Sequence, residues 1–280
     1  MSLPLTHPPL ATVPARPAAR RPPSLWRDAW ALTGRTFDHW RTRPGALAVQ
    51  LLFPVLIVLM MGGLFGGAIA GTAGDYMPFV VPGVLTLTML FGIEATMTAV
   101  ATDAAKALTD RFRSLPISAG AVLLGRVIAD MAASVLELSV MTLAGLALGW
   151  RPGEGLGAAV LAYLLLLWLR LALLWLGLLF GLRAAGPESI AAVQILVWPV
   201  GFLSTVFLDP ATMPRWLGVA AEWNPLSATA TAARDLFGNP GVAGLTWASE
   251  HATLLAVAWP AALLAVAVPL ATRAYRRLGA

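Results

Sequence analysis

The chain has 280 residues and a net charge of +5, with 58% hydrophobic and only 12% charged residues. Soluble globular proteins contain about 45 to 50% apolar and about 25% charged residues, so this composition excludes an ordinary soluble protein and indicates an integral membrane protein. The absence of cysteine excludes disulfides, thiolate metal sites and thiol catalysis.

The chain begins with two segments that precede the first apolar run. Residues 1–23 contain seven prolines and three arginines, which predicts a disordered tail. They lack the apolar core of a signal peptide, so we expect this tail to stay in the cytosol. Residues 24–44 place Trp26, Trp30 and further aromatic side chains at helical spacing, with arginines on the other face. This pattern favours an interfacial amphipathic helix over a soluble helix packed on another domain.

Residues 45–273 form a predicted transmembrane domain of six helices, followed by a cytosolic C-terminus at residues 274–280. A membrane-spanning helix needs about 20 apolar residues. The predicted spans are residues 46–69, 79–102, 119–148, 156–182, 188–207 and 252–272. The first ends in four glycines, which either let another helix approach or loosen the helix end. The predicted fold class is an all-α membrane protein.

Residues 208–240 fit neither a clean span nor a polar loop. Prolines divide them into pieces of about ten residues, which are too short to cross a bilayer. Apolar side chains keep a helical period inside these pieces. We therefore predict two short helices that dip into the outer face of the membrane or rest on it.

Residues 103–118, with the sequence DAAKALTDRFRSLPIS, are a charged island between two long apolar runs. A helix across the island puts Lys106, Asp110 and Arg113 on one face and apolar side chains on another, and Pro116 closes it. The island is either an ordinary loop whose basic residues fix the topology or a helix on which a partner acts.

Basic residues are distributed unequally between the two predicted sides of the membrane. Fourteen lie in the tail, the interfacial helix, the island, the turn at Arg183 and the C-terminus, against three on the other side. Because positive charge concentrates on the cytosolic side, both termini and the island are predicted to be cytosolic, with the chain in the plasma (inner) membrane. The same rule explains the net charge, so we expect no nucleic-acid partner.

Five charged residues fall inside the predicted spans: Glu94, Arg126, Asp130, Glu137 and Arg170. A charge at mid-span costs at least about 2.5 to 3.5 kcal/mol, so each needs a partner or a role. Arg126 and Asp130, four residues apart, can pair on one helix face. Arg170 matches Glu94 and Glu137 in depth, which predicts a bridge to one of them. That bridge is either a static interhelical pair or part of a polar transport path.

The sequence lacks common catalytic and nucleotide-binding motifs. A phosphate-binding loop GxxxxGK[ST] needs a lysine after glycine, whereas Lys106 follows alanine, and GxSxG and HExxH are also absent. The three histidines lie far apart, which argues against a metal site. We expect no catalytic residue, metal or cofactor in this chain, so an ATP-driven exporter would need a separate ATPase.

Three stretches together resemble the permease subunits of type-2 ATP-binding-cassette exporters, a group that includes daunorubicin-resistance permeases and polysaccharide or lipid exporters. They are the aromatic interfacial helix, DRFRSLPISAGAVLLGRVIAD at residues 110–130, and FLDPATMPRWLGVAAEWNPLSATATAARDLFGNP at residues 207–240. The likeness covers nearly everything from residue 24 onward.

The resemblance implies a homo- or heterodimer of permeases in the lipid bilayer, with six spans each and a path along the dimer interface. It also implies separate ATPase subunits that bind ATP and magnesium, with the island docking on them as a coupling helix. The implied coupling residues are Asp103, Lys106, Asp110, Arg111, Phe112, Arg113 and Pro116. The implied outer-gate residues are Pro214, Trp216, Trp223, Asn224 and Pro225.

The predicted function is therefore export of a hydrophobic or amphipathic cargo, such as a drug, lipid or glycan. Two rival functions stay open. A secondary transporter or channel would work without a nucleotide and would be favoured by an inverted repeat. An intramembrane lipid-modifying enzyme would need carboxylates or histidines gathered near one face of the membrane.

Overall fold

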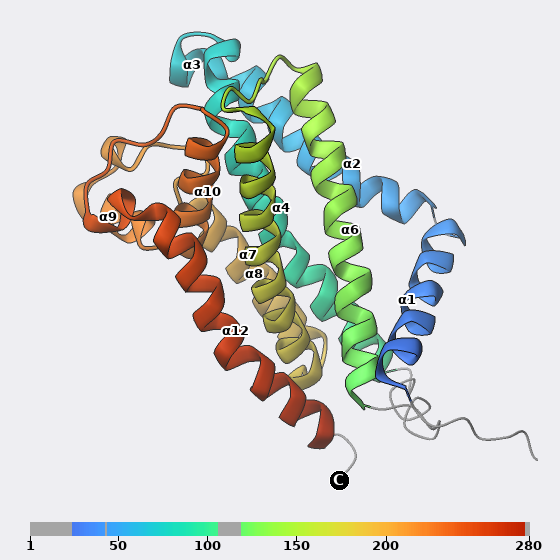
Figure 1. Cartoon of the computed structure of the whole chain (residues 1–280). Helices are drawn as coiled ribbons and strands as arrows, with labels where there is room; N and C mark the ends of the chain where they lie inside the picture. The colour runs from blue at the N-terminus through green and yellow to red at the C-terminus, as the bar shows by residue number, and fades with distance from the viewer. Residues whose placement is uncertain (1–23, 43, 106–118, 278–280) are drawn as a thin grey trace, which may run out of the picture.

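The computed structural model describes residues 24–42, 44–105 and 119–277, and in these residues the protein is all-helical (Figure 1). Some of the described helical segments are long and apolar enough to cross a membrane. They are Ala48–Ala70, Ala73–Asp103, Gly120–Ala147, Gly155–Arg183 and Ala252–Arg277. These segments confirm the prediction of an all-α integral membrane protein.

The fifth predicted span is shorter than the sequence suggested. It is helix α8 (Pro187–Phe202), whose 16 residues extend about 24 Å at 1.5 Å per residue. The hydrocarbon core is about 30 Å thick. The expected extension to residue 207 is wrong, because α8 ends at Phe202 and the backbone of Leu203 leaves the helical conformation, with φ −80° and ψ 58°. The count of six spans therefore stays a prediction.

Two long helices, α4 (Ala73–Ala105) and α7 (Gly155–Arg183), form the centre of the bundle. Burial covers 83% of the most apolar stretch of α4. Gly177 and Gly181 of α7 allow the two backbones to touch. A Cβ atom at either position would lie 2.9 Å from a carbonyl oxygen of α4, that of Ile93 or that of Met97. Small residues on one face thus determine how closely these helices pack.

The other long helices surround this pair (Figure 1). They are α2 (Pro44–Met60), α6 (Ala119–Ala147) and α12 (Ala252–Arg277). Helix α12 packs along α7, whereas α6 contacts both α4 and α7. Helices α2 and α8 lie against α4, and α2 also reaches α6.

The predicted amphipathic helix is α1 (Leu25–Thr42), and it packs against α6. Ala29 and Thr33 are buried in this contact, where the Thr33 hydroxyl donates to the carbonyl of Gly125 at 3.1 Å. Trp26 and Trp30 are 69% and 67% exposed. Small residues therefore attach α1 to the bundle, and these two tryptophans remain available to the surroundings, as an interfacial helix requires.

The glycines at the end of the first span coincide with a break in its helix. After α2 the chain forms a π-helical turn, η1 (Met61–Phe65), and then α3 (Gly66–Ala70). A Cβ atom at Gly66 would lie 2.8 Å from the Ala73 Cα, whereas Gly63 and Gly67 face open space. Gly62 also faces a close neighbour, the Met77 side chain. Gly62 and Gly66 therefore allow close approach of the following helix, whereas Gly63 and Gly67 make no such contact and fit the interpretation of a loosened helix end.

The region after α8 contains the two predicted short helices, α9 (Arg215–Glu222) and α10 (Pro225–Leu236). It also contains two shorter helical segments, η2 (Pro210–Thr212) and α11 (Trp247–Glu250). Helix α10 packs among α4, α7 and α12, and residues 226–234 are all buried. Helix α10 is therefore inserted into the bundle, and its position relative to the outer face of the membrane stays a prediction.

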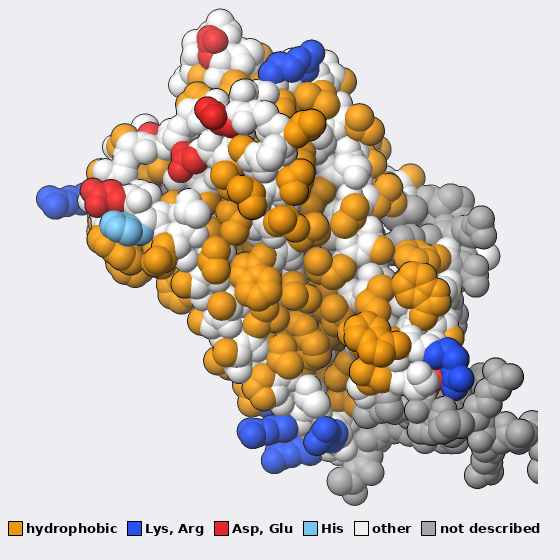
Figure 2. Space-filling model, in the orientation of Figure 1, with side chains coloured by type: hydrophobic (Ala, Val, Ile, Leu, Met, Phe, Trp, Pro, Cys, Tyr) orange, Lys and Arg blue, Asp and Glu red, His pale blue; other side chains and the backbone are white. Residues whose placement is uncertain are grey.

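The surface has the polarity of a membrane protein. Figure 2 shows hydrophobic side chains across the middle of the molecule, basic side chains at the end where α12 finishes, and acidic side chains toward the opposite end. An apolar surface between two charged ends matches a bilayer with aqueous layers on either side.

Replacing Gly177 with alanine should destabilise the bundle by about 1 to 3 kcal/mol, because the new methyl group overlaps the α4 backbone. Gly157, at the exposed start of the same helix, has no neighbouring atom within 4 Å of the place that a Cβ atom would take. Gly157→Ala should leave stability unchanged or slightly raised. Thermal unfolding in detergent measures both variants, and equal melting temperatures would contradict the close contact.

Candidate functional site

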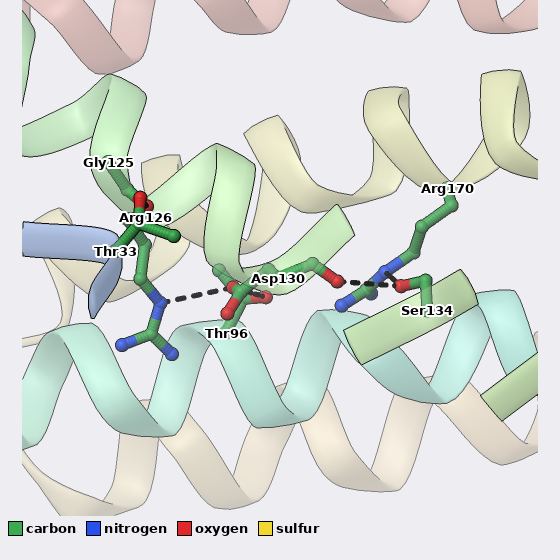
Figure 3. A network of polar contacts seen from close by, with 7 residues as sticks. All are labelled: Thr33, Thr96, Gly125, Arg126, Asp130, Ser134 and Arg170. Carbon is green, nitrogen blue, oxygen red and sulfur yellow. Dashed lines mark hydrogen bonds and ion pairs between the residues drawn. The ribbon is translucent and has the colours of Figure 1, made fainter. Parts of the chain in front are cut away.

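A network of polar side chains joins α4, α6 and α7 inside the bundle (Figure 3). The Asp130 carboxylate of α6 accepts from Arg126 Nε at 3.0 Å and from the Thr96 hydroxyl of α4 at 2.8 Å. The predicted pairing of Arg126 with Asp130 is thus confirmed. Because Thr96 shares the same carboxylate oxygen, the pair also ties α6 to α4.

Arg170 of α7 enters the same network, but not through the expected ion pair. Its Nε donates to the Ser134 hydroxyl at 2.8 Å, and Ser134 in turn donates to the Asp130 carbonyl at 2.9 Å. Among the described residues, no carboxylate lies within ion-pair distance of Arg170, so the predicted bridge to Glu94 or Glu137 is wrong. We call Thr96, Arg126, Asp130, Ser134 and Arg170 the polar network.

A glycine on α4 makes room for the buried guanidinium. A Cβ atom at Gly92 would overlap Nη1 of Arg170, so the guanidinium rests directly on the backbone of α4. Nη1 also reaches the Met89 carbonyl at 3.5 Å. Arg170 is only 3% exposed. The sequence predicted a buried charge at Arg170 but not its contact with the α4 backbone at Gly92, because the sequence does not tell which face of α4 turns toward α7.

The two remaining intramembrane carboxylates lie apart from Arg170. Glu137 of α6 accepts a hydrogen bond from the Gln50 amide and so links α6 to α2. Glu94 of α4 is partly exposed, and its buried Oε1 has no hydrogen-bond partner among the described residues. Glu94 lies one helical turn from Phe91, which belongs to a cluster of aromatic rings.

This aromatic cluster consists of Phe53, Phe91, Trp198 and Phe202, from α2, α4 and α8. Ring centroids of Phe91 and Trp198 lie 5.0 Å apart, and those of Phe53 and Phe91 lie 5.6 Å apart. Phe53, Trp198 and Phe202 are all at least 40% exposed. Sequence analysis missed the cluster because its members are far apart in the chain.

The predicted outer-gate residues lie at the ends of α9 and α10. Asn224 accepts from the Leu226 amide at 2.9 Å as the N-cap of α10, and Pro225 takes the first position of that helix. The Asn224 amide donates to the carbonyls of Val200 and Leu203 at 2.8 and 2.6 Å. Asn224 therefore fastens α10 to the end of α8.

The other outer-gate residues form an exposed surface. Pro214 precedes the first residue of α9, and Trp216 is 74% exposed. Trp223 stacks on Trp247 with ring centroids 6.3 Å apart, and Trp247 stacks in turn on His251. Amphipathic rings of this kind are typical of the boundary between membrane and water.

Arg234 of α10 is a fully buried arginine, and its position within residues 208–240 gave no sign of its contacts. Its Nη2 donates to the carbonyls of Thr205 and Val206 at 2.8 and 2.9 Å, and its Nε donates to the Phe79 carbonyl of α4 at 2.9 Å. The guanidinium also lies 3.8 Å from the centre of the Phe79 ring. Burial lowers the pKa of Arg234 to about 9, so it stays protonated at neutral pH.

Comparison with known proteins places this helical architecture in a family. Residues 27–237 match the family described as ABC-2 type transporter. The daunorubicin resistance ABC transporter permease protein DrrB1 of Streptomyces coeruleorubidus is 35% identical over 91% of this chain and 86% of its own length. The chain belongs to the ABC-2 type transporter family. Because its relatives are permeases, this ABC-2 protein is a transport subunit rather than an enzyme.

Two more distant relatives carry the name putative transport permease ycf38. The protein from Cyanophora paradoxa is 25% identical over 75% of this chain and 74% of its own length. The protein from Porphyra purpurea is 26% identical over 75% of this chain and 73% of its own length. Both are similar to the ABC-2 protein along most of the region that the structure describes.

The predicted coupling residues of the ABC-2 protein are only partly covered by the structure. Asp103 lies in the last turn of α4 and is half-buried. The structure does not describe the other predicted coupling residues, namely Lys106, Asp110, Arg111, Phe112, Arg113 and Pro116. The described histidine and carboxylate side chains include no group of three or more placed to hold a metal ion.

Replacing Ser134 with alanine should destabilise the ABC-2 protein by about 1.5 to 3 kcal/mol, because Arg170 Nε then loses its acceptor in a buried site. Ser139 is the matched control, since it lies on the exposed side of α6 and bonds only to the Val135 carbonyl. Ser139→Ala should change stability by less than about 0.5 kcal/mol. Thermal unfolding in detergent measures the two.

The double variant Ser134→Ala with Arg170→Met separates this effect from lost packing. It should be less destabilised than the sum of its single changes, because it contains no unpaired buried charge. Full additivity would contradict the role of Ser134 as the acceptor for Arg170.

Proposed function

We propose that this protein is the transmembrane subunit of an ATP-binding-cassette exporter that moves a hydrophobic or amphipathic cargo out of the cell. A separate ATPase subunit would bind ATP and magnesium on the cytosolic side. The observation that carries the proposal is the family match across residues 27–237 in a chain whose sequence contains no phosphate-binding loop. Both termini would lie in the cytosol and the chain in the plasma (inner) membrane.

The transport path would run between two permease copies, along the face that carries the aromatic cluster. Only 22% of the most apolar stretch of the first span is buried, compared with 83% for α4. Helix α8 is also largely exposed, with Ile195 and Leu196 at 69% and 62%. A second copy of the permease, identical or related, would cover part of this face, and the aromatic rings would meet the cargo there.

The nature of the cargo follows from the same face. Its described side chains are mainly aliphatic and aromatic, which suits a drug or a lipid better than a free sugar. The name of the 35% identical relative states resistance to daunorubicin, and this supports a drug-like cargo for the present chain.

The coupling between ATPase and path would begin at residues 106–118. These residues connect the end of α4 with the start of α6, and the polar network joins the same two helices to α7. A movement imposed on this connection would therefore reach all three helices together. Arg111, Phe112 and Arg113 are the residues that we propose for docking on the ATPase.

Reconstitution tests the function directly. The permease and an ATP-binding-cassette ATPase that co-purifies with it, placed together into vesicles, should move a fluorescent amphipathic cation or lipid only when ATP and magnesium are supplied. The measurement is the change of fluorescence across the vesicle membrane. Movement of cargo against its gradient by the permease alone, without ATP, would instead indicate a secondary transporter.

Coupling variants test where the ATPase acts. Combining Arg111→Ala with Arg113→Ala should lower ATP-dependent transport by about 5- to 150-fold. This factor corresponds to the typical coupling free energy between two sites, about 1 to 3 kcal/mol. Membrane insertion and thermal stability should not change. Arg215→Ala, an exposed arginine at the start of α9, is the control. Full transport by the double variant would show that the ATPase docks elsewhere.

A further inference from the structure

A pocket lies between the ends of α7 and α12, away from the polar network and the aromatic cluster. Its volume is about 340 Å³. It is lined by Leu182, Arg183, Leu270, Arg273, Ala274 and Arg277. We call it the arginine pocket, because half of its lining residues are arginines and none is acidic.

The arginine pocket holds a concentrated positive charge. Arg183 is the last residue of α7, and Arg273 and Arg277 lie one turn apart on α12. Among the described residues, none of these three side chains has a hydrogen bond or an ion pair. The two helix ends contribute only about half a negative charge each, which leaves a clear excess of positive charge. The electrostatic field therefore favours an anionic ligand.

The walls of the pocket show what kind of anion fits. Leu182 and Leu270 lie nearer to the middle of their helices than the arginines do, so the apolar part of the lining is on the side toward the middle of the bundle. Figure 2 shows the corresponding arrangement on the surface, where basic side chains at the end of α12 border the hydrophobic middle of the molecule. An apolar side next to a basic side suits a ligand with an anionic head and an apolar tail.

We propose that the arginine pocket binds the phosphodiester headgroup of an anionic phospholipid. Arginine forms paired hydrogen bonds with phosphate oxygens, and three guanidiniums offer more donors than one phosphate group needs. The volume of about 340 Å³ is at the lower end of the range for ligand pockets. It thus holds the headgroup, while the acyl chains lie in the bilayer beyond Leu182 and Leu270.

The proposal of a lipid site depends on the proposed function at one point. The proposed function places this end of the bundle at the cytosolic leaflet of the membrane. There the site would fix the ends of α7 and α12 relative to the lipid headgroups. Basic residues near a membrane surface contribute about 1 kcal/mol each to the binding of anionic lipids, which is about a fivefold change in affinity per arginine.

Lipid titration of the full-length permease in a neutral detergent tests the proposal. Native mass spectrometry would count bound phosphatidylglycerol, with phosphatidylcholine as the neutral lipid. The wild type should retain phosphatidylglycerol selectively. Arg277→Gln should bind it about fivefold more weakly, and the double variant Arg273→Gln with Arg277→Gln about thirtyfold more weakly. Arg215→Gln, which removes one exposed charge from α9, should bind it as the wild type does.

Several results would overturn the proposal. One is equal retention of phosphatidylglycerol by the wild type and the double variant, and another is equal retention of the two lipids. Displacement of the lipid by millimolar inorganic phosphate would assign the pocket to a free anion. The titration uses neither ATPase nor cargo, so its failure would leave the proposed export function intact.

Discussion

The buried guanidinium of Arg170 constrains how the three central helices pack. Within a bilayer no water is present to satisfy a charged donor, so its partners must come from neighbouring helices. Arg170 finds them in the Ser134 hydroxyl of α6 and the backbone of α4 beside Gly92. Each of these contacts requires a particular rotation of its helix. The charge on α7 therefore fixes the orientation of α4 and α6 as well as that of its own helix.

Because of this constraint, the three central helices α4, α6 and α7 are expected to move together. Asp130 joins α6 to α4 through Thr96, and Ser134 joins the same part of α6 to α7 through Arg170. Separating any one of these helices would leave a charged or polar group unpaired in a nonpolar environment, at a cost of several kcal/mol. A displacement at the ends of α4 and α6 that residues 106–118 connect is thus more easily accommodated by moving the three helices as one body than by changing their packing.

The amino-acid sequence predicts the parts of this arrangement that depend on local spacing. The lengths of the apolar runs indicated the long helices, and the four-residue spacing of Arg126 and Asp130 predicted their ion pair correctly. The partner of Arg170 could not be predicted from depth alone. Two carboxylates of suitable depth are present, Glu94 and Glu137, but the rotation of α4 presents Gly92 to the guanidinium in place of Glu94.

The short helices show the same limit of local patterns. Proline spacing predicted pieces too short to cross the membrane, which agrees with α9 and α10. A helical period cannot tell whether such a helix lies on the surface or inside the bundle. The available signal was the run of alanine and threonine before Arg234, because side chains that small allow α10 to enter between α4, α7 and α12.

The insertion of α10 constrains how the neighbouring helices can move. Arg234 holds the segment after α8 through Thr205 and Val206 and holds α4 through Phe79. Withdrawing α10 alone would strand its guanidinium without acceptors, which for a buried charge costs about 3 to 5 kcal/mol. Because Asn224 ties α10 to α8 as well, a movement that carries α8, α10 and the part of α4 around Phe79 together avoids this loss.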